Sequence, residues 1–160
     1  MTSLKSKQSG FTIVELLIVI VVIGILAGLV ITTFNGIQQK GRDTERQTDV
    51  KAIHAQVEAF WAQKGYYPSL TDLNDRAATT GFVAVNLKGL DAEAFQDPKG
   101  TASALVGAPA ANAYSYAATD SAGATCNTAG STTCAKYTLT ATLEGTINGA
   151  TTYVKTSLNN

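Results

Sequence analysis

Residues 11–34 read FTIVELLIVIVVIGILAGLVITTF, and this stretch decides the fold of the 160-residue chain. Its 24 residues include a single charged side chain, Glu15. A helix of this length extends about 36 Å, whereas the hydrocarbon core of a bilayer is about 30 Å thick. We therefore predict a membrane-spanning helix over residues 11–34.

The residues before this apolar run are polar and basic, with Lys5 and Lys7 followed by Gly10. A secretory signal peptide has its cleavage site after the apolar core, usually at small residues of the A-x-A type. Residues 31–36, ITTFNG, offer no such site, and the small residue Gly10 stands in front of the run instead. The two lysines fit a cytoplasmic leader by the positive-inside bias. An ordinary N-terminal membrane anchor is the alternative interpretation.

The segment KSKQSG followed by FTIVELLIVIVVIGILA resembles the class III signal of type IV pilins and type II secretion pseudopilins. The resemblance implies that a prepilin peptidase cuts between Gly10 and Phe11 on the cytoplasmic side and leaves the apolar helix on the mature protein. It also implies N-methylation of Phe11. The implied partners are membrane lipid before assembly, an inner-membrane assembly platform, and further copies of the chain in a homopolymeric filament.

Glu15 lies four residues after the expected cleavage site. A carboxylate inside an apolar helix is costly, less so near the interface than at the bilayer centre. It would lie about 6 Å along the helix from the new N-terminus. A neighbouring subunit's Phe11 amine could neutralise it, and the resemblance implies that this contact sets the register of assembly. A glutamate resting at the membrane interface is the alternative.

Gly24 and Gly28 form a G-x-x-x-G pattern within the same run. This spacing puts both glycines on one helix face and lets another helix approach closely. It is equally a local weak point, because a mid-helix glycine costs roughly 0.5–1 kcal/mol relative to alanine.

Composition limits the remaining function classes. The formal net charge is zero, and removing Lys5 and Lys7 with the leader leaves 10 basic and 12 acidic residues, a net charge of −2. No broad basic face is expected, so direct nucleic-acid binding is not predicted. No nucleophile elbow, phosphate-binding loop or paired-carboxylate motif is evident. We therefore expect neither an enzyme nor a cofactor.

Residues 35–64 are predicted to continue the apolar helix as an amphipathic one, with a bend or partial unwinding at Gly36 and Gly41. Apolar residues recur at steps of three and four, the helical period, and form one stripe for burial. They are Val50, Ile53, Val57 and Phe60.

Charged residues between these apolar positions pair at i,i+3, which supports a helix by a few tenths of a kcal/mol per pair. Two interpretations stay open, a collar that pairs between subunits and a solvated helix face. These i,i+3 pairs are Arg42/Glu45, Asp43/Arg46 and Arg46/Asp49.

His54 lies beside the apolar stripe and has no second histidine or cysteine nearby in the sequence. We therefore expect a structural or exposed role for it.

The sequence KGYYPS at residues 64–69 ends the long helix, because glycine caps a helix and Pro68 disfavours helical geometry at Tyr67. This turn resembles the end of the long helix in pseudopilins and Gram-positive-type pilins. Aromatic residues around it are expected to pack the head against the helix. They are Phe60, Trp61, Tyr66 and Tyr67.

The head begins with a predicted short helix at residues 69–80, with Ser69 or Thr71 as its cap and Gly81 beyond its end. Residues 81–112 are expected to be irregular, with a turn at residues 97–100, DPKG. This turn resembles the one that precedes the sheet in major pseudopilins. The apolar residues predicted for the core here are Phe82, Val83, Val85, Leu87, Leu90 and Phe95.

Strands are predicted at residues 113–117, 135–143 and 151–157. In the second, Tyr137, Leu139, Ala141 and Leu143 alternate with threonines, the period of a half-buried strand. Turns are predicted at Glu144-Gly145 and Asn148-Gly149.

Cys126 and Cys134 enclose seven small or polar residues. In an exported, loop-rich region this pattern predicts a disulfide that closes a local loop. Reactive thiols are the weaker alternative, because no basic neighbour would lower a thiol pKa. The resemblance to major pseudopilins raises calcium as a further alternative, but only Asp120 lies close by. We predict no metal site.

We predict an α+β fold in which a helix of up to 54 residues carries a small antiparallel sheet on its second half. The expected parts are a cleaved leader (1–10), a transmembrane assembly helix (11–34), an amphipathic helix (35–64) and a globular head (65–160). The resemblance implies a pilin of a type IV pilus-like filament. The expected location is the inner membrane, with the head outside the cytoplasm, and then the cell surface. Alternatives are a major pseudopilin of type II secretion and a membrane-tethered domain that never polymerises.

Overall fold

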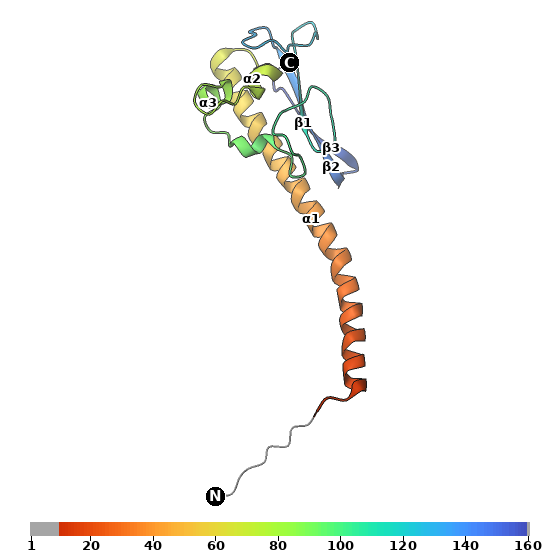
Figure 1. Ribbon diagram of the computed structural model, residues 1–160. Coiled ribbons are helices and arrows are strands. Elements are labelled where there is room, and N and C mark those ends of the chain that lie inside the picture. Colours follow the sequence, from red (N-terminus) through yellow and green to blue (C-terminus); the bar gives the residue numbers. More distant parts are fainter. Residues whose placement is uncertain (1–9, 160) are drawn as a thin grey trace, which may run out of the picture. The chain divides into compact units, whose positions relative to one another are not determined.

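The computed structural model describes residues 10–159 (Figure 1). Lys5 and Lys7, the basic residues of the expected leader, lie outside these described residues. The chain divides into two compact units, Met1–Gln38 and Gln39–Asn160. The second unit contains the sheet and the buried core, which confirms the α+β fold class.

Helix α1 (Ile13–Lys64) is a single α-helix of 52 residues that passes through both units. The predicted unwinding at Gly36 and Gly41 is wrong, because both residues are α-helical. Each glycine costs about 1 kcal/mol relative to alanine, which a long run of better helix formers on both sides can offset. The helix ends where predicted, because Gly65 has φ +77° and donates its N–H to the Trp61 carbonyl at 2.7 Å.

Helix α2 (Leu70–Asn74) is preceded by its cap, Ser69, which forms a reciprocal capping box with Asp72. The predicted helix over residues 69–80 is therefore too long. Asp75 leaves the helical conformation with ψ 91°, and its carboxylate accepts the Phe82 N–H at 3.0 Å. That contact folds the chain back on itself instead of extending the helix.

The region after Gly81, predicted to be irregular, contains helix α3 (Phe82–Asn86) and the short 3-10 helix η1 (Ala92–Phe95). Gly81 packs against the preceding turn so tightly that an added Cβ would lie 2.3 Å from the Ala77 nitrogen. Only glycine fits there, so this residue starts α3 instead of simply ending the previous helix. The predicted turn at residues 97–100 is present, with the Gly100 N–H donating to the Asp97 carbonyl at 2.7 Å.

The sheet has the order β1-β2-β3 and is antiparallel throughout. Its strands are β1 (Tyr114–Thr119), β2 (Lys136–Ile147) and β3 (Ala150–Thr156). The turn between β2 and β3 lies at Asn148 and Gly149, with φ 51° and 81°, as a tight hairpin requires.

The predicted turn at Glu144-Gly145 is wrong, because β2 continues through both residues. The strand register shifts between Thr142 and Ile147, and the two N–H groups point to another partner. Both donate to the Asp43 carboxylate of α1 at 2.9 Å. The dipeptide therefore marks an irregularity in the strand where the sheet is attached to the helix.

The core lies between the sheet and the part of α1 that follows Gln39 (Figure 1). The predicted apolar stripe of α1 is confirmed, since each of its four residues is at most 3% exposed. The alternating apolar residues of β2 are buried as predicted. Val85 is half exposed, so its assignment to the core is wrong, whereas Leu105 is buried without having been predicted.

Aromatic packing around the end of α1 follows the prediction. Phe60 meets Tyr66 edge to face at 5.5 Å between ring centroids, and Trp61 stacks with Tyr67 at 6.0 Å. Tyr67 also meets Tyr137 of β2 at 4.8 Å. These contacts join the last turns of α1 to the sheet.

Candidate functional site

The residues that the sequence singles out for processing, Gly10 and Phe11, precede α1, and Glu15, singled out for assembly, lies in its first turn. Thr12 precedes the first helical residue, and its hydroxyl accepts the Glu15 N–H at 3.3 Å. One Glu15 carboxylate oxygen in turn accepts the Thr12 N–H at 2.8 Å and the Thr12 hydroxyl at 2.7 Å. Thr12 and Glu15 therefore form a reciprocal capping box, which gives hydrogen-bond partners to two backbone N–H groups that the start of the helix leaves unpaired.

The large apolar side chains of residues 11–34 are all exposed. Their exposed fraction ranges from 48% at Val22 to 84% at Phe11 and Ile13. Within residues 10–159, α1 is the one helix long and apolar enough to cross a membrane. An exposed apolar surface of this extent is typical of a membrane or protein interaction site.

Gly24 and Gly28 leave open space on this helix. A Cβ added at either position would meet no atom within 4 Å. Neither glycine is therefore required by packing within its own chain. Close approach of a second helix and a local weak point both stay predictions for this pattern.

In the head, Arg46 of α1 is 1% exposed and binds three carboxylates. It holds Asp97 with two hydrogen bonds of 2.7 and 2.9 Å, which is the fork geometry of a strong ion pair. A third guanidinium nitrogen, Nη1, lies 2.8 Å from Asp43 and 3.0 Å from Glu144. We call these four residues the Arg46 cluster.

Two further cations surround the Arg46 cluster. Arg42 holds Glu144 with hydrogen bonds of 2.6 and 2.7 Å, and the Lys99 ammonium lies 3.2 Å from the same carboxylate. The hydrogen bonds from Arg42 are the main cause of a pKa for Glu144 far below its usual value. Burial alone would raise the pKa of Asp43, but two backbone N–H groups and the buried arginine lower it overall.

The ion pairs that the charged residues of α1 form thus differ from those predicted from the sequence. Asp43 and Arg46 do pair, but inside the head and not on a solvated face or between subunits. Arg42 reaches Glu144 instead of Glu45, and the Asp49 carboxylate accepts the Tyr114 hydroxyl at 2.7 Å. The arginines join α1 to the sheet and to the turn at residues 97–100.

A second polar cluster lies at the other end of the head, around Glu58. Its carboxylate accepts the Tyr137 hydroxyl at 2.8 Å, the Tyr67 hydroxyl at 3.0 Å and the Leu158 N–H at 3.1 Å. His54 Nδ1 lies 2.7 Å from the Tyr137 oxygen, and burial lowers the pKa of His54. Because that hydroxyl donates its one proton to Glu58, Nδ1 is the donor to Tyr137. The structural role predicted for His54 is confirmed.

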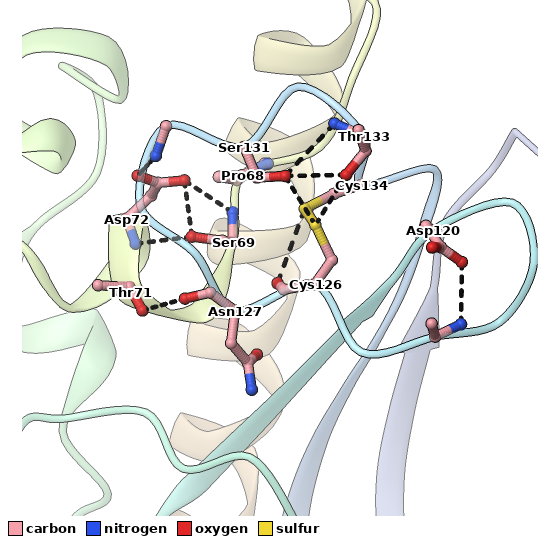
Figure 2. Close-up of a disulfide and its surroundings, with 12 residues drawn as sticks. Pro68, Ser69, Thr71, Asp72, Asp120, Cys126, Asn127, Ser131, Thr133 and Cys134 are labelled. Atoms are coloured by element: carbon pink, nitrogen blue, oxygen red, sulfur yellow. Dashed lines mark hydrogen bonds between the residues drawn. A yellow bond between two sulfur atoms is a disulfide. The ribbon is translucent and has the colours of Figure 1, made fainter.

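Cys126 and Cys134 are joined by a disulfide, as predicted, with 5.6 Å between their Cα atoms. The enclosed loop is also tied to α2 by two hydrogen bonds. The Gly130 N–H donates to the Asp72 carboxylate at 2.8 Å, and the Thr71 hydroxyl donates to the Asn127 carbonyl. Figure 2 shows Thr71 and Asp72 on one side of the disulfide and Asp120 on the other.

Asp120, the acidic residue considered for calcium, accepts the N–H groups of Ala122 and Ala124, each at 2.9 Å. Its carboxylate therefore stabilises its own turn. Within the described part of the chain, no group of three histidine, cysteine, aspartate or glutamate side chains has the arrangement of a metal site.

Some of these contacts have a signal in the local sequence, and others do not. Thr12-x-x-Glu15 has the spacing of a capping box, a signal that the sequence-based prediction missed. In the Arg46 cluster only the Asp43 contact has a local signal, because Asp97 and Glu144 lie 51 and 98 residues further along the chain than Arg46.

Comparison with known proteins supports the N-terminal assignment. Residues 5–31 match the family described as "Prokaryotic N-terminal methylation motif". The chain is 36% identical over 61 residues to "Type IV major pilin protein PilA" of Myxococcus xanthus, covering 38% of this chain and 28% of that protein. It is 34% identical over 65 residues to "Type II secretion system core protein G" of Aeromonas hydrophila, covering 41% and 46%.

A longer match, 27% identical over 100 residues, is to the protein of the same secretion name in Pectobacterium carotovorum, covering 59% of this chain and 64% of that protein. The chain thus spans less than half the length of the two relatives named first. No solved structure matches it. The similarity to type IV pilins and type II secretion pseudopilins that the N-terminal residues indicate is confirmed.

Proposed function

We propose that this chain is a structural subunit of a type IV pilus-like filament, assembled through its N-terminal helix. One observation carries the proposal, a match to a methylation motif over residues 5–31 together with a helix, α1, whose apolar side chains are exposed before Gln38. The head has its own buried core, whose residues all lie after Gln39. The chain thus combines a part that buries its apolar side chains with a part whose apolar side chains would be covered by lipid or other chains.

Processing is proposed to expose the assembly end of the helix. Cleavage by a prepilin peptidase between Gly10 and Phe11 would create an amine at Phe11, the residue proposed for N-methylation. Glu15 is held by Thr12 within the first helical turn, so its charge has a fixed place beside that new terminus. In a low-dielectric bundle of helices, an amine from a neighbouring subunit would pair strongly with this carboxylate.

The proposed location follows from the same features. The exposed apolar helix supports anchoring in the inner membrane before assembly. The disulfide supports a head outside the cytoplasm, because such bonds persist in oxidising compartments. Residues 1–10 are then the cytoplasmic leader, and the mature subunit reaches the cell surface within the filament.

A pseudopilin of type II secretion is the second candidate. Several relatives carry the name "Type II secretion system core protein G", which favours it. The cysteine loop in place of an acidic calcium loop favours the pilin. Deleting the gene separates the two functions, since loss of surface pili with normal exoprotein secretion supports a pilin and the reverse supports a pseudopilin. A tethered domain that never polymerises predicts neither loss.

Processing gives the first test. Replacing Gly10 by leucine should leave the precursor uncut, because the peptidase must accommodate a small residue before the cut. Gly10→Ala should be cut less completely than the parent chain. Mass spectrometry of the membrane fraction measures both. A Gly10→Leu chain that still begins at Phe11 would contradict the assigned cleavage site.

A further inference from the structure

A groove on the head shares no lining residue with the Arg46 cluster, the cluster around Glu58 or the disulfide loop. It has a volume of about 440 Å³ and lies between α3, η1 and the segment that follows α2. Its apolar lining includes Val83, Leu87 and Leu90 together with the small Ala84. This volume falls within the roughly 300–1,000 Å³ of small-molecule sites.

Two cationic side chains line the groove, Arg76 and Lys88. The Arg76 guanidinium lies over the Phe95 ring, 4.8 Å from its centroid, and donates a hydrogen bond to the Ser103 carbonyl. Stacking on a ring and bonding to a backbone group fix its position without neutralising its charge.

Arg76 differs from the other half-buried and buried arginines of the head. Arg42 and Arg46 each hold at least one carboxylate. For Arg76 and Lys88, no carboxylate partner occurs anywhere within residues 10–159. Burial lowers the pKa of Arg76, and no acidic group offsets that effect. Arginine remains charged nonetheless, so the lining of this groove includes a positive charge that no carboxylate pairs within residues 10–159.

We propose that this groove binds a small organic carboxylate with an apolar body, the carboxylate on Arg76 and the body against Val83, Leu87 and Leu90. A guanidinium matches a carboxylate with two parallel hydrogen bonds, and Lys88 at the rim adds a second positive charge. A small molecule fits better than a protein partner, because a stable protein interface needs about 800 Å² from each side. The proposal is independent of filament assembly.

The probe is 3-phenylpropionate, with its neutral amide, 3-phenylpropanamide, as the matched ligand. The full chain in detergent micelles, labelled with nitrogen-15, is titrated with each ligand while backbone amide shifts are followed. Shifts should saturate at residues 82–88 with the carboxylate. Binding of the amide should be about tenfold weaker, since it lacks the charged hydrogen bonds.

Four variants complete the test. Arg76→Gln should weaken 3-phenylpropionate binding about tenfold and Lys88→Gln about threefold, the smaller effect reflecting an exposed charge. Lys136→Gln, an exposed lysine on β2, should change nothing. Ala84→Leu fills the groove without touching a charge and should abolish binding, which keeps the test decisive if Arg76→Gln does not fold.

Three results would each overturn the proposal. One is the absence of saturable shifts at residues 82–88 up to about 20 mM ligand, because a dissociation constant above that concentration would be too weak for a specific small-molecule site. Another is equal binding of the carboxylate and the amide. The third is unchanged binding by folded Arg76→Gln or by Ala84→Leu.

Discussion

At the residue scale, Glu15 has a local partner before any other subunit arrives. The capping box with Thr12 explains why a carboxylate is tolerated at the start of an apolar helix, since it satisfies an N–H group that the helix leaves unpaired. It also raises a competing explanation, in which Glu15 is a helix cap and nothing more. A variant that keeps the capping hydrogen bond of Glu15 and removes its charge therefore distinguishes a role in assembly from a role in helix capping.

Glu15→Val removes the cap and the charge, whereas Glu15→Gln removes only the charge and leaves an oxygen to accept the Thr12 N–H. Both chains should insert in the membrane and be processed, because removing an intramembrane charge favours insertion. Both should form few or no filaments, because a neighbouring Phe11 amine would be left unpaired. The measurement is membrane level against sheared surface filament in the same cells. Normal filaments from Glu15→Gln would show that the glutamate acts only as a cap.

The Arg46 cluster is the other feature that depends on single residues. The pKa of Glu144 and of Asp43 is lowered in the folded head, so the unfolded chain binds more protons in acid. Their contribution to stability is present above the usual carboxyl range and is lost as the pH falls through and below about 4. Removing one partner of such a buried cluster typically costs about 3–5 kcal/mol.

We predict that the free energy of unfolding falls steeply between pH 5 and pH 3 in the parent chain, roughly the range in which carboxylates of ordinary pKa take up protons. Glu144→Gln should be less stable at pH 7 and should lose less on acidification. The exposed Glu45→Gln is the matched control and should follow the parent. Thermal unfolding followed by tyrosine circular dichroism measures all three. Equal acid dependence in Glu144→Gln and the parent would contradict the role assigned to Glu144.

At the element scale, the features set by hydrophobic periodicity could be predicted from the sequence, whereas those set by distant contacts could not. The apolar stripe of α1 and the alternation in β2 are local patterns, and both are confirmed. The helix predicted over residues 69–80 breaks because Asp75 bonds to Phe82, and the Glu144-Gly145 turn is absent because Asp43 binds both N–H groups. Neither partner is adjacent in sequence, so no local pattern could reveal it.

The disulfide loop is an element held in two ways, by the bond itself and by its hydrogen bonds to α2. Replacing both cysteines by serine should lower the free energy of unfolding by roughly 2–3 kcal/mol, the chain-entropy value for so short a loop. The hydrogen bond from Gly130 to Asp72 should keep the loop near its place, so the head should still fold.

Chemical denaturation measures the loss, and limited proteolysis between Cys126 and Cys134 reports whether the loop opens. Asp72→Asn in the oxidised chain is the comparison, since it weakens the loop contact and the capping box with Ser69 but keeps the disulfide. A double serine variant as stable as the parent would contradict the proposed clamp. So would recovery of both cysteines as free thiols from exported protein.

At the scale of the whole molecule, the chain joins a head with a complete core to a helix whose apolar side chains are exposed. The sequence predicted this division, because a long uncharged run and an amphipathic run differ in composition alone. It did not show that Arg46 is buried, because the turn and strand that cover it are placed only by the fold. The proposed function therefore depends on the apolar helix finding cover from copies of itself.

The intact mass of the subunit in sheared surface filaments tests the proposed function most directly. We predict a chain that begins at Phe11, carries one added methyl group, and lacks two hydrogens because Cys126 and Cys134 are joined. The same species should be found in the membrane fraction as the pool from which filaments are assembled. A chain that is confined to the membrane, begins at Met1 and is absent from every sheared fraction would contradict assembly through the N-terminal helix.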